Sequence, residues 1–259
     1  MRPEAAIAEA NGLLRGTPVF IAGSCVAAEV YAHDSFSDLD MFVPTQQVLI
    51  STVQNLLNHG YTIDDRFGRV WHRWLRYGLK GWHTNSIRLY SKADVETNVV
   101  FKIVDGHATT TLAQVLESFD FGLLAVGYDL EMDTFRDLRP YLFPGMDISG
   151  ALPMMPGRRD AWRNGYISQY NGLREAARYA KYHRYGYDMS LIKDDLVNGY
   201  RMVASYHLSK SDDTDAQLLG QIYTALGDKV EFDEIDELIT SYKTLDFKDS
   251  LDEIMEALE

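Results

Sequence analysis

Apolar and polar positions divide the first 130 residues into short helices and strands. Apolar residues at helical spacing predict helices over residues 4–14, 25–32, 45–59 and 110–118, the last capped by Thr110 or Thr111. Short apolar runs and alternating runs predict strands over residues 17–22, 38–43, 70–77, 86–90, 98–104 and 119–128, separated by turns rich in glycine and polar residues. This part of the chain is therefore expected to combine a sheet with helices.

The pattern changes after residue 138. Residues 139–158 contain Pro140, Pro144, Pro153 and Pro156 together with three glycines, which is typical of a domain boundary. Beyond it, apolar spacing predicts only helices, over residues 160–185, 190–208, 213–226, 232–243 and 248–258. We predict an α+β protein with a mixed-sheet domain over residues 1–145 and an all-α domain over residues 146–259.

The charge of the chain is unevenly distributed. The net charge is −13, but 15 Asp and Glu against 4 Lys give residues 209–259 a charge of −11, and the preceding residues carry about −2. Residues 66–88 and 158–184 are locally basic. We expect the acidic C-terminal helices to form a solvated face or to dock a protein partner. A polyanion is expected to bind elsewhere, through the basic segments.

Several classes of protein are excluded by composition. No apolar run approaches the ~20 residues of a membrane-spanning helix, so no membrane association is expected. The N-terminal residues contain acidic side chains and no continuous apolar core, unlike a secretory signal. The single cysteine, Cys25, excludes an intramolecular disulfide and makes a cysteine-based zinc site improbable. We interpret the chain as cytoplasmic.

Four residues form a constellation with chemical meaning. Gly23 and Ser24 end a predicted strand where a helix begins, a place where backbone N–H groups and a small side chain suit a phosphate. Asp38 and Asp40 follow on the next predicted strand, where alternation directs both carboxylates to the same face. Two adjacent carboxylates repel each other unless a cation lies between them, and Mg²⁺ couples carboxylates to substrate phosphates. The alternative is that this Asp pair lies on a solvated edge strand beside an ordinary turn.

This Gly-Ser and Asp-x-Asp arrangement resembles the signature of the DNA polymerase β-like nucleotidyltransferase superfamily over residues 17–130. The resemblance implies transfer of a nucleoside monophosphate from a nucleoside triphosphate (NTP) to a hydroxyl, with two Mg²⁺ ions held by carboxylates. It also implies a third carboxylate between apolar neighbours on a nearby strand. Phe119-Asp120-Phe121 fits that form, with Glu96 and Asp94 as alternatives.

A basic stripe on the predicted helix 160–185 is a candidate nucleotide or RNA contact. Arg174, Arg178 and Lys181 lie near each other at helical spacing and border an apolar face. The run from Arg174 to Tyr182 also resembles a helix of RNA-directed members of the superfamily. The acceptor expected from this resemblance is an RNA 3′ end, such as that of tRNA. A protein, an aminoglycoside-like small molecule and a non-catalytic nucleotide-binding or interaction module remain alternatives.

Overall fold

The computed structural model describes residues 1–34, 36–64, 84–104, 107–163, 175, 178–179, 181–193 and 195–196 of the 259-residue chain. The chain divides into two compact units, Met1–Met155 and Pro156–Glu259. The predicted strand 70–77 and the predicted helices beyond residue 196 lie outside the described residues. Within the described part, no helix has the length and apolar character that crossing a membrane requires.

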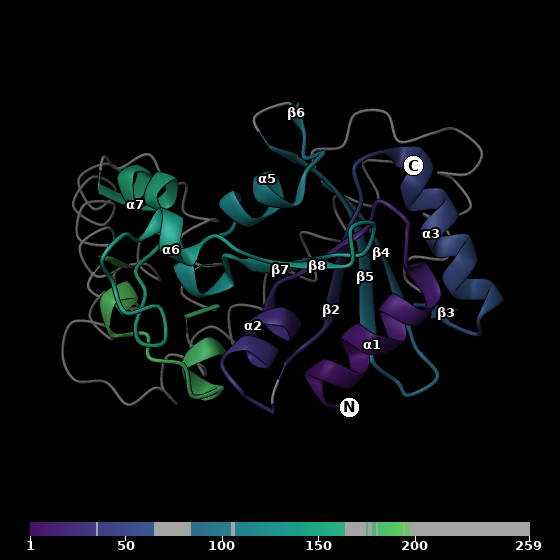
Figure 1. The fold of residues 1–259 in the computed structure, drawn as a ribbon, viewed down its shortest axis with the longest axis horizontal. Helices are drawn as coiled ribbons and strands as arrows, with labels where there is room; N and C mark the ends of the chain where they lie inside the picture. Colours follow the sequence, from purple (N-terminus) through teal and green to yellow (C-terminus); the bar gives the residue numbers. More distant parts are fainter. Residues whose placement is uncertain are drawn as a thin grey trace, which may run out of the picture. The chain divides into compact units, whose positions relative to one another are not determined.

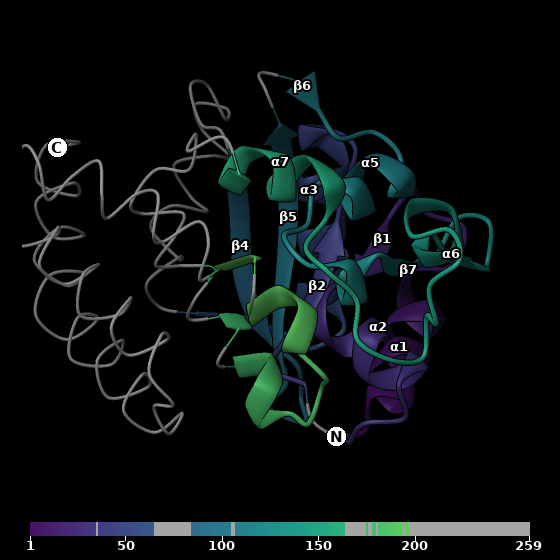
Figure 2. The same ribbon diagram turned by 90° about the vertical axis from the view of Figure 1, so that its left-hand side faces the viewer.

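A mixed sheet forms the centre of the first unit, as Figures 1 and 2 show. Its strands have the order β3-β4-β5-β2-β1-β7-β8, and β6 pairs with β5 off this path. The strands are β1 (Phe20–Ala22), β2 (Leu39–Phe42), β3 (Thr62–Ile63), β4 (Thr84–Tyr90), β5 (Glu96–Val104), β6 (His107–Ala108), β7 (Val126–Asp129) and β8 (Thr134–Asp137). β2 and β5 pair in parallel, and the other neighbouring strands of the described residues pair antiparallel. The predicted α+β class is confirmed.

Helices cover both faces of this sheet. Among the described residues, the helices of the first unit are α1 (Pro3–Leu14), α2 (Ser24–Val30), α3 (Gln46–Asn58), α5 (Leu112–Glu117) and α6 (Arg139–Leu142). α2 and α5 both contact β7 and lie on opposite sides of it (Figure 1). Thr111 begins α5 with a reciprocal capping box, in which its side chain and that of Gln114 each accept from the other's backbone N–H. The helices predicted over residues 4–14, 25–32, 45–59 and 110–118 are confirmed by α1, α2, α3 and α5, whereas α6 was not predicted.

Strand alternation gives the two faces of the central strands different surroundings. Leu39, Met41 and Val43 are buried on one face, as their alternation with Asp38 and Asp40 predicts. On the other face, Phe42 packs in a cluster with Val100 and Leu116 of α5. α5 therefore covers the C-terminal part of this face, whereas polar residues occupy its N-terminal part.

The strand predicted over residues 119–128 is wrong in its first part and is observed only from Val126. The segment bends into a short 3₁₀ helix, Gly122–Leu124, and becomes a strand only at β7. The packing around this bend requires glycine at position 122, because a Cβ there would lie 2.8 Å from the Pro153 carbonyl oxygen and 2.7 Å from the Phe143 ring. The continuous apolar run is buried in either conformation, so periodicity alone does not separate the two.

A buried arginine fastens the end of the sheet to the loop that follows it. Arg139, 5% exposed, donates from Nε and Nη2 to the two carboxylate oxygens of Asp137 at 2.9 and 2.8 Å. Its Nη1 donates to the Ile148 carbonyl oxygen at 3.1 Å, and its guanidinium lies 4.9 Å from the ring centroid of Tyr31. One side chain thus joins β8, the loop at residue 148 and the end of α2.

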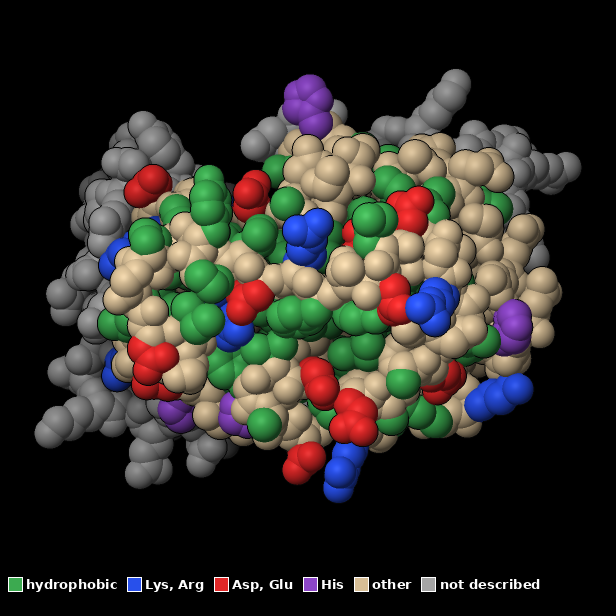
Figure 3. Space-filling model, viewed as in Figure 1, with side chains coloured by type: hydrophobic (Ala, Val, Ile, Leu, Met, Phe, Trp, Pro, Cys, Tyr) green, Lys and Arg blue, Asp and Glu red, His purple; other side chains and the backbone are tan. Residues whose placement is uncertain are grey.

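The surface of the first unit includes some apolar side chains. Phe135 of the edge strand β8 and Tyr141 of α6 are among the exposed large ones. Hydrophobic side chains also reach the surface between charged ones on the face drawn in Figure 3.

The described residues of the second unit are helical or lie in turns. α7 (Pro156–Arg163) carries two consecutive arginines that bind buried carboxylates. Arg158 pairs with Glu175, which is 1% exposed, and Arg159 Nε donates to Asp195 Oδ1 at 2.9 Å. Buried carboxylates are stabilised only when paired, so these contacts tie α7 to later helical segments of the same unit.

Candidate divalent-cation site

Asp38 and Asp40 lie together at the N-terminal end of β2. Asp40 is opposite Ala22 of β1 on one side and Asn98 of β5 on the other. Asp38 directly precedes the strand, and both aspartates are half-buried. Both carboxylates therefore lie at the N-terminal end of a central strand and remain partly accessible to solvent.

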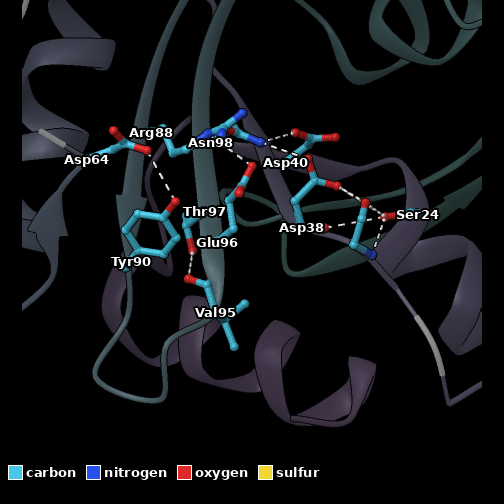
Figure 4. A network of polar contacts seen from close by, with 11 residues as sticks. Ser24, Asp38, Asp40, Asp64, Arg88, Tyr90, Val95, Glu96, Thr97 and Asn98 are labelled. Carbon is cyan, nitrogen blue, oxygen red and sulfur yellow. Dashed lines mark hydrogen bonds and ion pairs between the residues drawn. The ribbon is translucent and has the colours of Figure 1, made fainter. Parts of the chain in front are cut away.

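One amide group joins these two carboxylates (Figure 4). Asn98 Nδ2 donates to Asp38 Oδ2 at 2.8 Å and to Asp40 Oδ1 at 3.1 Å. One oxygen from each carboxylate therefore points to a single position, which now holds the positive end of an amide dipole. Sequence reasoning missed Asn98 because it considered carboxylates as ligands. The available signal was a polar residue at the head of the apolar predicted strand 98–104.

Serine hydroxyls hold Asp38 from its other side. Ser37 Oγ donates to Asp38 Oδ1, and Ser24 Oγ lies 3.4 Å from the same oxygen. The Ser37 backbone N–H donates to Ser24 Oγ at 3.3 Å. Ser24, at the start of α2, therefore fixes the turn that presents Asp38, a positioning role that its place in the sequence did not reveal.

Gly23 provides the space that Asp40 occupies. Its φ is +90°, and a Cβ at this position would lie 2.9 Å from Asp40 Oδ2. Only glycine combines this backbone conformation with such a close approach to the carboxylate. The Gly-Ser pair thus positions both carboxylates from the start of α2.

Replacement of Gly23 by alanine is expected to affect both folding and the site. The variant should lose about 1–3 kcal/mol of stability through backbone strain and the displaced carboxylate, and it should bind Mn²⁺ about tenfold more weakly. Chemical denaturation and calorimetric titration would measure the two effects. Gly16→Ala is the matched control, since Gly16 has φ +77° but nothing within 4 Å of an added Cβ. An equal loss of Mn²⁺ affinity in both variants would contradict the role of Gly23.

The polar surface continues across the sheet from the two aspartates. Arg88 of β4 is opposite Asn98, and its Nε lies 3.0 Å from Glu96 Oε1 (Figure 4). Tyr90 Oη donates to Asp64 Oδ2 at 3.2 Å further along. Glu96, an alternative third carboxylate, is thus held by an arginine. Asp94, the other alternative, lies in the turn before β5 with φ +59°.

Asp120 lies outside the two strands that border β2. It follows α5, is 6% exposed, and its carbonyl oxygen accepts from the Met155 N–H at 2.9 Å. The strands beside β2 are β1 and β5, and the residue facing Asp40 from β5 is Asn98. Over the described ranges, no three His, Cys, Asp or Glu side chains gather as a metal-binding group.

The basic stripe belongs to the second unit. Arg174 lies outside the described residues, whereas Arg178 and Lys181 are half-buried there. Lys181 Nζ lies 5.5 Å from the ring centroid of Tyr182. Tyr182 also packs edge-on against Tyr187. The described part of this stripe therefore borders a tyrosine cluster.

Cys25 lies beside the site but is chemically protected. It is fully buried in α2, and its Sγ lies 3.7 Å from the Pro3 carbonyl oxygen. Burial, followed by the charges of Asp40, Glu29 and Asp38, raises the pKa of the thiol to about 12. A thiol with this pKa is almost entirely protonated at neutral pH, and only the thiolate is an effective nucleophile.

The folded chain is therefore expected to resist thiol reagents. The rise of the pKa from 9.0 to about 12 leaves about a thousandfold less thiolate at pH 8 than in an unfolded chain. Dithionitrobenzoate should modify Cys25 quickly in guanidinium and negligibly in buffer at the same pH. Fast, stoichiometric modification of the folded chain would contradict this account.

The residues present suit a small divalent cation. One oxygen of Asp38 and one oxygen of Asp40 both face Asn98 Nδ2. The amide of Asn98 also carries a carbonyl oxygen. Mg²⁺ is bound by such hard oxygen ligands and usually retains several waters or substrate oxygens. This part of the sheet can therefore hold a cation whose remaining coordination positions are filled by water or by an anionic ligand.

Solved structures with a similar fold include enzymes that process tRNA. A CCA-adding enzyme in complex with CTP has a TM-score of 0.47 and 12% identity, covering 83% of this chain and 47% of that chain. A tRNA-processing enzyme in an apo form has a TM-score of 0.49 and 16% identity, and the match covers 95% of this chain and 59% of that chain. A complex of a tRNA-processing enzyme has a TM-score of 0.47 and 12% identity, and the match covers 94% of this chain and 65% of that chain.

The chain thus spans between about half and two thirds of the length of these structures. No protein-family model matches the sequence, and no curated protein matches it. At these identities and TM-scores, the similarity does not define the chemistry of this chain.

Proposed function

We propose that the chain is a metal-dependent nucleotidyltransferase, which moves a nucleoside monophosphate from an NTP to a hydroxyl and releases pyrophosphate. One observation carries this proposal: Asp38 and Asp40 converge beside the Gly23–Ser24 start of α2. Two carboxylates on a central strand next to a close-approaching glycine suit the binding of a metal–triphosphate complex. The sequence resemblance to the polymerase β-like superfamily points to the same chemistry.

Each residue of the site has a defined role in this proposal. Asp38 and Asp40 hold Mg²⁺, two ions in the arrangement that the resemblance implies. When bound, Mg²⁺ neutralises phosphate charge and lowers the pKa of an attacking hydroxyl. Ser24 keeps Asp38 oriented through the turn at Ser37, and Gly23 lets the triphosphate and Asp40 approach the backbone closely. Catalysis then depends on positioning and charge neutralisation, without a covalent enzyme intermediate.

The acceptor that we propose is an RNA 3′ end, such as that of tRNA. This choice follows the resemblance of the stretch Arg174–Tyr182 to RNA-directed members of the superfamily. The cations Arg178 and Lys181 are candidate contacts for the RNA backbone or the triphosphate, because phosphate contacts dominate RNA affinity. The acidic C-terminal residues 209–259 are unsuited to RNA and are left for a protein partner or for solvent.

A labelling experiment tests the proposal directly. The purified full-length chain is incubated with Mg²⁺, each α-labelled NTP in turn, and total RNA, and the products are separated on a denaturing gel. The variant Asp38→Asn/Asp40→Asn serves as the inactive control. Asp120→Asn is run beside it to test the third carboxylate that the resemblance implies.

Each outcome has a defined meaning. Label on RNA that the double variant does not produce would support an RNA nucleotidyltransferase, and the labelled band would identify the acceptor class. Label on protein, or on an added aminoglycoside, would support nucleotidyl transfer and overturn the RNA acceptor. Absence of any metal-dependent transfer, with nucleotide still bound, would overturn the enzymatic proposal in favour of a binding module.

A further inference from the structure

We propose that Asn98 is the third ligand of the cation, and that its amide turns over when the ion binds. This inference rests on the proposed function for the identity of the site, and it concerns a residue that the sequence resemblance does not assign. In the structure, Asn98 donates its Nδ2 hydrogens to the two aspartates. In the loaded conformation, its Oδ1 takes the position of Nδ2 and coordinates Mg²⁺ or Mn²⁺.

The place of Asn98 in the sheet supports this role. β5 runs parallel to β2, with Asn98 opposite Asp40, and the side chains on this face point the same way from both strands. The next residues on that face, Phe42 and Val100, are buried in the cluster beneath α5. Asn98 is therefore the neighbouring-strand residue that directly adjoins Asp40 at the polar end of the face, as Figure 4 shows.

The contacts of Asn98 place a partial positive charge between the two aspartates. Two carboxylates at this separation repel each other, and each N–H of the amide is directed to one of them at 2.8 and 3.1 Å. An amide dipole carries only a partial positive charge, whereas a divalent cation carries two full charges. A cation that displaces the N–H donor therefore gains much stronger attraction to the same two oxygens.

The shape of the amide makes the exchange possible without movement of the backbone. A half-turn about the Cβ–Cγ bond interchanges Nδ2 and Oδ1, which are nearly equal in size. The carbonyl oxygen is a hard ligand of the kind that Mg²⁺ and Mn²⁺ accept. The same side chain can thus act as a donor to the two carboxylates in one orientation and as a cation ligand in the other.

The neighbouring carboxylate of β5 is engaged elsewhere. Glu96 precedes Asn98 by two residues on the same face, and Arg88 Nε lies 3.0 Å from its Oε1. Asn98 therefore completes a ligand set of two carboxylates and one neutral oxygen. The two negative charges of such a set balance the charge of one divalent ion. Because Asn98 is not a base, another group must accept the proton of the acceptor hydroxyl.

Cation binding to the full-length chain, measured without nucleotide, tests this inference. Mn²⁺ affinity is determined by calorimetry and by electron paramagnetic resonance for the wild type, Asn98→Ala and Asn98→Asp. We expect Asn98→Ala to bind about tenfold more weakly and Asn98→Asp to bind more tightly than wild type. Asn58→Ala, an exposed residue at the end of α3, is the matched control and should leave the affinity unchanged.

Nuclear magnetic resonance tests the turnover itself. The side-chain amide signals of Asn98, identified by their loss in Asn98→Ala, should shift on titration with Mg²⁺, whereas those of Asn58 should not. Unchanged Asn98 signals at saturating Mg²⁺, or Asn98→Ala binding Mn²⁺ as tightly as wild type, would overturn the inference. Asn98→Asp binding no better than Asn98→Ala would overturn it as well.

These results separate the inference from the proposed function. Asn98-dependent binding without any nucleotidyl transfer would retain the ligand role and overturn the enzymatic proposal. Metal-dependent nucleotidyl transfer, combined with cation binding that does not depend on Asn98, would support the enzymatic proposal and overturn the ligand role of Asn98.

Discussion

Replacement of Asp40 by asparagine is expected to lower the rate of nucleotidyl transfer about a thousandfold. This loss corresponds to about 4 kcal/mol of transition-state stabilisation, a magnitude reasonable for a lost metal ligand. The fold should be retained, because Asn has the shape of Asp and its Oδ1 can still accept from Asn98 Nδ2. Initial rates with labelled NTP, measured beside thermal unfolding, would distinguish lost chemistry from lost structure.

An exposed aspartate provides the control for this substitution. Asp147 lies on the surface and accepts from the backbone N–H of Ser149 at 2.9 Å. Asp147→Asn makes the same chemical change away from the sheet and should leave the rate within about twofold of wild type. Retention of more than a tenth of the wild-type rate by Asp40→Asn would be incompatible with a carboxylate that holds the catalytic metal.

Replacement of Arg139 by methionine is expected to have the largest effect on stability. Methionine replaces the aliphatic part of the arginine side chain but donates no hydrogen bond, so Asp137 and the Ile148 carbonyl oxygen would lose their partner. We expect a loss of about 3 kcal/mol, less than for a fully buried pair because Asp137 retains some exposure. At 2–4 °C per kcal/mol for a unit of this size, Tm should fall by roughly 6–12 °C.

The pH dependence of this loss follows from the pKa of Asp137. Burial acts to raise this pKa, but the hydrogen bonds and charge of Arg139 outweigh it and hold it below its ordinary value of 3.8. A carboxyl group with a lowered pKa contributes stability above its unfolded pKa and loses it as the pH falls through its folded pKa. The difference between wild type and variant should therefore be largest near neutral pH and shrink below about pH 3.8.

The surface pair of Arg15 and Asp133 is the control for the buried one. The Arg15 side chain is 68% exposed, so water and salt screen its charge. Arg15→Met should destabilise the chain much less than Arg139→Met in the same denaturation experiment. Equal losses in the two variants would mean that burial does not strengthen the pairing of Arg139.

Helices and strands were predictable from sequence where a single hydrophobic periodicity dominated the segment. The helix predicted over residues 45–59 is observed at Gln46–Asn58, since its apolar spacing continues for three turns and Thr45 caps it. The strand predicted over residues 98–104 is also observed, within β5. The strand β8, Thr134–Asp137, was not predicted because its side chains are mostly exposed and show no apolar alternation.

The site was only partly predictable, because local sequence patterns do not specify the order of strands in a sheet. Alternation was sufficient to direct Asp38 and Asp40 to one face. It did not reveal that β5, nearly 60 residues later, lies beside β2 and brings Asn98 to them. The expectation for Asp120 had the same weakness, since it relied on a motif that bends where a strand was predicted.

The position of β1 in the sheet has a consequence for the synthesis of the chain. β1 pairs with β7, which is made about a hundred residues later, and the hydrogen bond from Asn11 to Asp133 spans 122 residues. One edge of β1 therefore has no partner strand until the β7–β8 hairpin has left the ribosome. Until then, the N-terminal helices cover an incomplete sheet with an exposed edge, which is a site for aggregation or chaperone binding.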